Sequence, residues 1–192
     1  MSEGGGGFSR QLLPRLFIAQ RHRPAHLAEI DIEALTPFER GLLVIVGLVT
    51  QFIEAHQLEA VEVEQLSQER IALEEDQPWL EAAYGDLVAS RSVLLTGGAS
   101  GRVYVHGQAL IVEERLSPGM RIALARPDLG IGRALRRERI ELYGDLLWCG
   151  TEQVDLPGLP SDRAVVSRTY RFVTAGTPSM LITERFAPRG NS

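Results

Sequence analysis

Hydrophobic and polar residues alternate with a period of two in several stretches of the chain. Such alternation is typical of β-strands that have one buried and one exposed face. It predicts strands from residue 60 onward and over residues 88–95, 102–112, 141–149, 164–173 and 180–186. Turn-forming residues at 97–101 and 174–178 lie in two of the gaps. They predict two β-hairpins.

Start and stop signals for helices occur mainly in the first third of the chain. Thr36 can cap a helix, Pro37 suits the first helical position and Glu39 can reach back to the cap. Gly47 interrupts this helix, and Thr50 can cap a second, short one. The helices predicted from such signals and from helical spacing cover residues 37–46, 51–55 and 129–137.

These elements predict a fold class. Strands joined by hairpins need no crossover helices, so they form an antiparallel sheet. The helices can then cover the same face of that sheet. We therefore predict an α+β fold with a single antiparallel sheet of about six strands and helices covering one face.

The ends of the chain differ from its middle. Residues 1–34 are expected to form a flexible N-terminal segment that is partly docked, within which the glycine-rich Met1–Gly7 is disordered. Residues 35–192 are expected to form one domain. Within this domain, residues 69–78 are expected to be a charged connector.

The composition excludes several classes of protein. All 20 basic residues are arginine, and with 25 acidic residues they give a formal net charge of −5, which argues against nucleic-acid binding. The lack of lysine excludes Schiff-base chemistry, whereas arginine suits two-pronged binding of carboxylates. The single cysteine, Cys149, excludes an intrachain disulfide and fits a reducing compartment. The longest apolar stretch, residues 41–49, is far below the roughly 20 residues of a membrane span, so we expect a cytoplasmic protein.

The common catalytic motifs are missing from the sequence. There is no Gly-x-Ser-x-Gly elbow, His-Glu-x-x-His pair, dinucleotide-binding turn or phosphate loop. The four histidines, His22, His26, His56 and His106, are scattered, which favours a solvated or core-edge role for each over metal binding. We therefore expect no metal and no cofactor. The sequence leaves the oligomeric state open.

Two charged residues lie where the strand pattern predicts the core. Arg91 shares a face with Ala89 and Val93, and Glu184 shares a face with Ile182. An isolated charge is buried only at a large free-energy cost, so each needs a partner or access to water. One interpretation is a structural ion pair or a strand-end position. The other is a buried anion pocket in which Arg91 grips a carboxylate and Glu184 orients a hydroxyl.

The last hairpin carries a family resemblance. Residues 168–186, RTYRFVTAGTPSMLITERF, resemble the closing hairpin of the chorismate pyruvate-lyase family, which includes microbial 4-hydroxybenzoate synthases. Three further segments resemble parts of this family in the same order along the chain: GLVT at 47–50, SRSV at 90–93 and GIGRAL at 130–135. The similarity spans roughly residues 35–186.

The resemblance implies a chorismate lyase-like fold with a closed cavity on one face of the sheet, under helical flaps. It implies that Arg91 binds the ring carboxylate and that Glu184 holds the hydroxyl at ring position four. Main-chain amides at Val49 and Ile131 are implied as further hydrogen-bond donors. The predicted helix starts near these two residues agree, because free N–H groups there favour anions.

The implied reaction converts chorismate to 4-hydroxybenzoate and pyruvate, as in the supply of ubiquinone or plastoquinone rings. Loss of the enolpyruvyl ether with the neighbouring ring hydrogen makes the ring aromatic, so no redox cofactor or metal is required. The protein holds the dianion in a reactive pose, excludes water and stabilises charge on the departing oxygen. Whether Glu184 moves a proton or only orients the hydroxyl stays open.

The sequence departs from the family at the first helical turn. Many relatives have an acidic residue before the glycine and a hydroxyl residue after it, where this chain has Val46 and Leu48. Two alternatives to the lyase therefore stay open. One is a non-enzymatic sensor of small aromatic acids, although residues 1–30 are expected to be too short for a DNA-binding helix pair. The other is a family member that has lost its activity.

Overall fold

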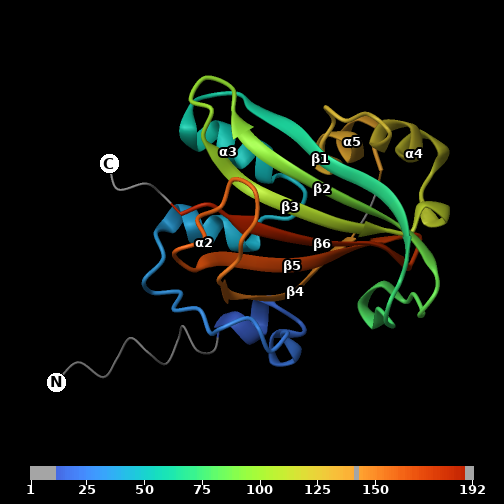
Figure 1. Ribbon diagram of the computed structural model, residues 1–192, viewed down its shortest axis with the longest axis horizontal. Helices are drawn as coiled ribbons and strands as arrows, with labels where there is room; N and C mark the ends of the chain where they lie inside the picture. Colours follow the sequence, from blue (N-terminus) through green and yellow to red (C-terminus); the bar gives the residue numbers. More distant parts are fainter. Residues whose placement is uncertain (1–11, 141–142, 189–192) are drawn as a thin grey trace.

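The computed structural model describes residues 12–140 and 143–188, whose strands form one antiparallel sheet in the order β1-β2-β3-β6-β5-β4 (Figure 1). The strands are β1 (Val61–Ala72), β2 (Leu87–Gly97), β3 (Val103–Ile111), β4 (Tyr143–Glu152), β5 (Val165–Thr174) and β6 (Thr177–Phe186). Both predicted hairpins are present, as β2-β3 and β5-β6. The α+β class and the single antiparallel sheet are confirmed.

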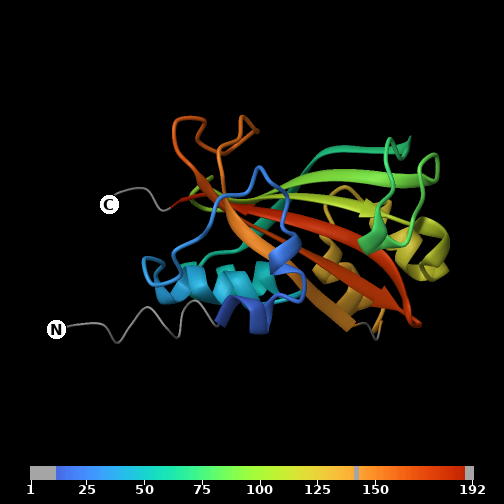
Figure 2. The same ribbon diagram turned by 90° about the horizontal axis from the view of Figure 1, so that it is seen from below.

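The α-helices cover one face of this sheet, as predicted (Figure 2). They are α2 (Pro37–Val44), α3 (Val49–Gln57), α4 (Pro118–Leu124) and α5 (Ile131–Arg137), and short 3₁₀ turns occur at η1 (Gln20–His22), η2 (Pro78–Leu80) and η3 (Glu113–Arg115). Two clusters of buried side chains join helices to sheet. Ile53 of α3 packs with Val105 of β3 in one, and Leu135 of α5 packs with Phe172 of β5 in the other. No helix within the described ranges is long and apolar enough to cross a membrane.

The start of α2 matches the sequence prediction. Thr36 accepts a hydrogen bond from the Glu39 amide at 3.3 Å, and the Glu39 carboxylate accepts one from the Thr36 amide at 2.8 Å, which completes a capping box. The prediction for the next helix is wrong in one detail. Helix α3 begins at Val49, after Leu48, and no side chain caps it, so Thr50 lies within its first turn.

Two other elements differ from the prediction. Helix α4 was not predicted, although Ser117 caps it through the Met120 amide and Pro118 occupies its first position. Strand β1 continues to Ala72, so the expected charged connector starts later than residue 69. Charged residues suit this part of β1 because it is an exposed edge strand, where charge discourages pairing with other chains.

The N-terminal segment packs along the other edge strand, β4. The Ile18 amide donates to the Leu146 carbonyl at 2.9 Å, and Ala28 forms an isolated β-bridge with Thr151. The Gln20 side chain pairs with both backbone groups of Cys149, at 2.8 and 2.9 Å. The segment therefore satisfies backbone groups that an open edge would expose. Met1–Gly7, expected to be disordered, lies outside the described residues.

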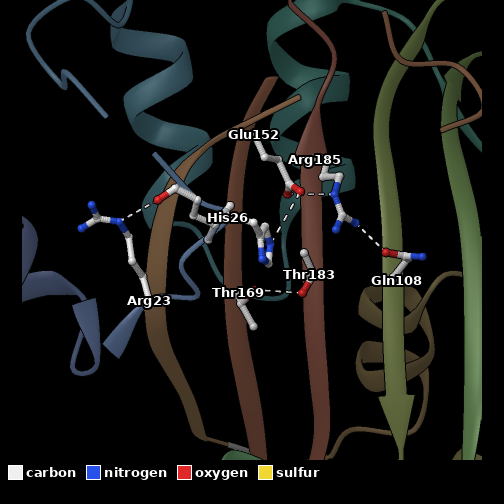
Figure 3. Close-up of polar contacts among 8 residues, drawn as sticks. Arg23, His26, Gln108, Glu152, Thr169, Thr183 and Arg185 are labelled. Carbon is white, nitrogen blue, oxygen red and sulfur yellow. Dashed lines mark hydrogen bonds and ion pairs between the residues drawn. The ribbon is translucent and has the colours of Figure 1, made fainter. Parts of the chain in front are cut away.

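The face of the sheet opposite the helices carries a polar network (Figure 3). The Arg185 guanidinium donates to Glu152 at 2.9 Å and to the Gln108 amide oxygen at 2.5 Å. The His26 ring lies 3.9 Å from the second oxygen of Glu152. Charges on this face therefore pair with one another, away from the helix-covered face.

His106 is the most deeply buried titratable group on this opposite face, at 1% exposure. Its Nε2 lies 3.2 Å from the Ser92 hydroxyl, and its Nδ1 has no hydrogen-bond partner among the described residues. Burial lowers the pKa of His106, and the nearby charge of Arg185 lowers it further. The folded protein therefore takes up a proton at His106 less readily than the unfolded chain does.

This difference predicts a loss of stability in acid. As the pH falls from the ordinary histidine pKa of 6.5 toward the lowered value, the unfolded chain binds a proton at His106 that the folded protein does not bind. The free energy of unfolding therefore decreases. We expect the melting temperature of His106→Gln to fall less than that of the wild type between pH 7.5 and pH 5. The two decreases should differ by a few °C, because about 1 kcal/mol moves the Tm of a domain this size by about 2–4 °C.

The matched control is His22→Gln, because His22 is exposed at the end of η1 and has no ion pair among the described residues. It should follow the wild-type melting temperature across the same pH range. Equal acid sensitivity of the His106 variant and the wild type would contradict the assignment.

Candidate functional site

A cavity lies on the helix-covered face of the sheet, below the first turns of α3 and α5. It contains about 650 Å³ of space free of atoms, a volume that includes open solvent at its mouth. The four residues predicted for the site, Arg91, Glu184, Val49 and Ile131, all line it. The other lining residues are Gly47, Thr50, Val93, Leu95, Val105, Gly107, Gln108, Ala109, Gly130, Gly132, Tyr170, Phe172 and Ile182.

Arg91 projects from β2 into this cavity and is 2% exposed. Its guanidinium donates to the carbonyls of Leu124 at 2.6 Å and Leu129 at 2.9 Å, and to the side-chain oxygen of Gln68 at 3.1 Å. These contacts hold the end of α4 and the segment leading into α5. Arg91 forms no salt bridge with a carboxylate in the described part of the chain, and its buried Nε atom has no partner there.

The charge of Arg91 is therefore uncompensated. Burial lowers the pKa of Arg91, but a guanidinium group keeps its proton throughout the physiological range. Neutral carbonyl oxygens stabilise this cation only in part, since a buried charge needs an opposite charge nearby. An anion in the cavity would supply it.

Glu184 projects from β6 into the same cavity and has a partner that the sequence analysis missed. Arg168 of β5, which is fully buried, donates to one oxygen of Glu184 at 2.9 Å from Nε and at 2.6 Å from Nη2. The Tyr170 hydroxyl donates to the other oxygen at 3.0 Å. Burial, then the charge of Glu184, raises the pKa of Tyr170, so its hydroxyl keeps the proton that it donates.

The structural ion pair, one of the two alternatives for Glu184, is therefore present, and it borders the cavity. The pair with Arg168 neutralises Glu184, so the buried charges at the cavity sum to one positive charge, that of Arg91. The Arg91 guanidinium can bind an anionic group in the cavity. The Glu184 carboxylate, elsewhere in the cavity lining, can accept a hydrogen bond. A molecule carrying a carboxylate and a hydroxyl has the complementary groups.

The two helices above the cavity meet through backbone atoms. Gly47 precedes α3 with φ +73°, a conformation that favours glycine. A Cβ on Gly132 of α5 would lie 2.5 Å from the Gly47 carbonyl oxygen, so the approach needs glycine there too. Val49 and Ile131 are the first residues of their helices, and no side chain caps either helix. Their amides are therefore donors without an intrahelical partner.

An ion pair ties the same two helices together. Arg133 of α5 donates to Glu54 of α3 at 2.7 Å and to the Val61 carbonyl at 2.8 Å. Glu54 also accepts from the Val61 amide at 3.1 Å. Arg133 thus links α3, α5 and the start of β1 over the cavity.

The two departures from the family pattern lie outside the cavity lining. Val46 packs with the cluster that contains Phe172, and Leu48 is 43% exposed. Thr50, which sequence analysis treated as a cap, does line the cavity. No group of three or more His, Cys, Asp or Glu side chains could hold a metal in residues 12–140 and 143–188.

Comparison with known proteins identifies relatives. A family model described as chorismate pyruvate-lyase Rv2949c-like matches residues 43–191. A protein named chorismate pyruvate-lyase from Mycobacterium leprae is 27% identical over 166 residues, covering 80% of this chain and 77% of its own. One of the same name from Mycobacterium tuberculosis H37Rv is 29% identical over 108 residues, or 52% of each chain.

Solved structures with the same fold are more distant in sequence. PhnF from Mycobacterium smegmatis has a TM-score of 0.58 at 13% identity, covering 75% of this chain and 65% of that one. The C-terminal domain of a histidine utilization repressor from Pseudomonas syringae has a TM-score of 0.54 at 9% identity, covering 69% and 96%. This likeness concerns the fold alone, and it agrees with the predicted chorismate lyase-like architecture.

The backbone contact between the helices predicts the effect of one methyl group. Gly132→Ala places a carbon against the Gly47 carbonyl, so the first turns of α3 and α5 must separate. We expect faster amide hydrogen exchange in residues 47–52 and 131–135, by about tenfold, which corresponds to about 1.4 kcal/mol of local stability. The comparison is made by mass spectrometry on the protein without ligand.

Gly119→Ala in α4 is the control for this substitution. Its Cβ would meet the end of the Glu138 side chain, which can move aside, whereas the carbonyl of Gly47 cannot. Unchanged exchange in the Gly132 variant would show that the two turns are not in tight contact in solution.

Proposed function

The chain belongs to the Rv2949c-like chorismate pyruvate-lyase family, and we propose that it is a lyase that converts chorismate to 4-hydroxybenzoate and pyruvate. The observation that carries this proposal is the uncompensated charge of Arg91, which shares one cavity with the acceptor Glu184. Chorismate has a ring carboxylate and a ring hydroxyl, which match these two groups. The free amides of Val49 and Ile131 are further donors for its oxygen atoms.

The bond changes balance within the substrate. The carbon–oxygen bond to the enolpyruvyl group breaks, and the neighbouring ring carbon, which bears the hydroxyl, loses its hydrogen. That hydrogen ends on the methylene carbon of the leaving group, which becomes the methyl group of pyruvate. The protein's contribution is to bind the dianion in one orientation and to exclude water.

The reaction is tested directly with purified protein and chorismate. We expect one equivalent each of pyruvate and 4-hydroxybenzoate per chorismate consumed, measured by a coupled pyruvate assay and by chromatography. The same rate is expected after treatment with EDTA, because the proposed chemistry needs no metal. Binding of 4-hydroxybenzoate without consumption of chorismate would instead indicate a sensor or a family member without activity. An aromatic acid other than 4-hydroxybenzoate would change the product assignment.

Removal of the Arg91 charge should abolish tight binding of the carboxylate. We expect Arg91→Gln to weaken 4-hydroxybenzoate binding by about 100-fold or more, because loss of a buried charge partner costs about 3 kcal/mol or more. Isothermal titration calorimetry measures the change. Arg121→Gln, at an exposed position of α4, is the matched control and should bind as the wild type does. Equal affinity of the Arg91 variant and the wild type would remove Arg91 from the site.

A further inference from the structure

Both oxygens of the Glu184 carboxylate are engaged by protein donors. Arg168 donates twice to Oε2, at 2.9 and 2.6 Å, and Tyr170 donates once to Oε1, at 3.0 Å. Two charge-assisted hydrogen bonds to one carboxylate fix its plane and orientation. The oxygens of such a group can still accept another hydrogen bond from a ligand.

Arg168 is itself held in place from several sides. Its guanidinium carbon lies 4.9 Å from the Tyr170 ring centre and 5.6 Å from that of Phe186. Its side chain has no solvent exposure, and it is not among the residues that line the cavity. Arg168 therefore contacts Glu184 from within the core and does not reach the position of a ligand.

We propose that Arg168 is a positioning residue that holds Glu184 as a permanent hydrogen-bond acceptor, so that this end of the cavity selects a ring hydroxyl. Glu184 then donates no proton during the reaction. This inference rests on the proposed function, and it assigns the role that the sequence left open. It fits the balance of the reaction, in which the hydrogen lost by the ring is the one gained by pyruvate.

Few other charged or titratable groups surround Glu184. Arg168 and Tyr170 come from β5, and Arg91 comes from β2 across the cavity. The residue opposite on β3 is Gly107, and α3 and α5 contribute no charged side chain to the lining. A change in the preference for a hydroxyl after substitution of Arg168 can therefore be assigned to Glu184.

The test compares 4-hydroxybenzoate with benzoate, which lacks the hydroxyl. The ratio of their dissociation constants is measured by calorimetry from pH 5.5 to 8.5. In the wild type we expect a preference for 4-hydroxybenzoate that varies less than threefold between pH 6 and 8. In Arg168→Gln, the Glu184 carboxylate loses the two donated hydrogen bonds that fix its plane, so the preference for 4-hydroxybenzoate should fall at least tenfold.

Conservative variants separate this role from a structural one. Arg168→Lys keeps the charge but loses the two-pronged contact with Glu184, so its preference should lie between those of the wild type and Arg168→Gln. If Arg168 only supported the fold, Arg168→Gln would weaken both ligands equally and leave their ratio unchanged at every pH. That result would overturn the inference.

Glu184→Gln decides the question if Arg168→Gln does not fold. The neutral amide should lower the preference at least tenfold at all pH values and should raise the KM for chorismate, with kcat reduced less than tenfold. A 100-fold loss of kcat at unchanged KM is the expected size for a general acid and would overturn the inference.

Failure of the inference and failure of the proposed function give different results. If the wild type binds both benzoates but leaves chorismate intact, the proposed reaction fails, whereas the test of Arg168 still stands. If chorismate is converted and the preference in Arg168→Gln equals that of the wild type, only the inference on Arg168 fails.

Discussion

The site depends on one constraint, which is that it buries two positive charges and only one negative charge. Arg91 and Arg168 both lie on the helix-covered face of the sheet, and Glu184 neutralises only Arg168. The remaining charge of Arg91 is stabilised by carbonyl groups in the segment that leads from α4 into α5. The protein therefore buries a cation that has no counter-charge among the described residues, and the same contacts join this cation to the segment between α4 and α5.

The antiparallel sheet determines where these charges lie. Neighbouring strands place Arg91, Gly107 and Glu184 on one face, because side chains two residues apart along a strand share a face. Charges on the opposite face, such as Arg185 and Glu152, pair with each other there. The sheet thus separates the face that carries the cavity from a face whose polar groups pair with one another.

The sequence predicts some site residues and misses others for physical reasons. The period of two placed Arg91 correctly because β2 is regular around it. The same period places Arg168 beside Tyr170 on the buried face, but its pairing with Glu184 was missed because a bulge shifts the register between Phe172 and Val173. An unshifted hairpin would bring Ser167 opposite Glu184. Thr50 was taken as a cap because threonine is common at that position of a helix. The residue types alone do not show that the helix already begins at Val49, after Leu48. The packing of the helix, rather than one residue type, determines at which residue it begins.

Two interactions hold α3 and α5 together above the cavity, and they respond differently to salt. The contact between Gly47 and Gly132 involves backbone atoms, so ionic strength leaves its geometry unchanged. The Arg133–Glu54 pair has side chains that are 35% and 28% exposed, so dissolved ions screen it within a Debye length of about 8 Å at physiological ionic strength. Added salt should therefore change how often the two helices separate, while the backbone contact that shapes the cavity stays constant.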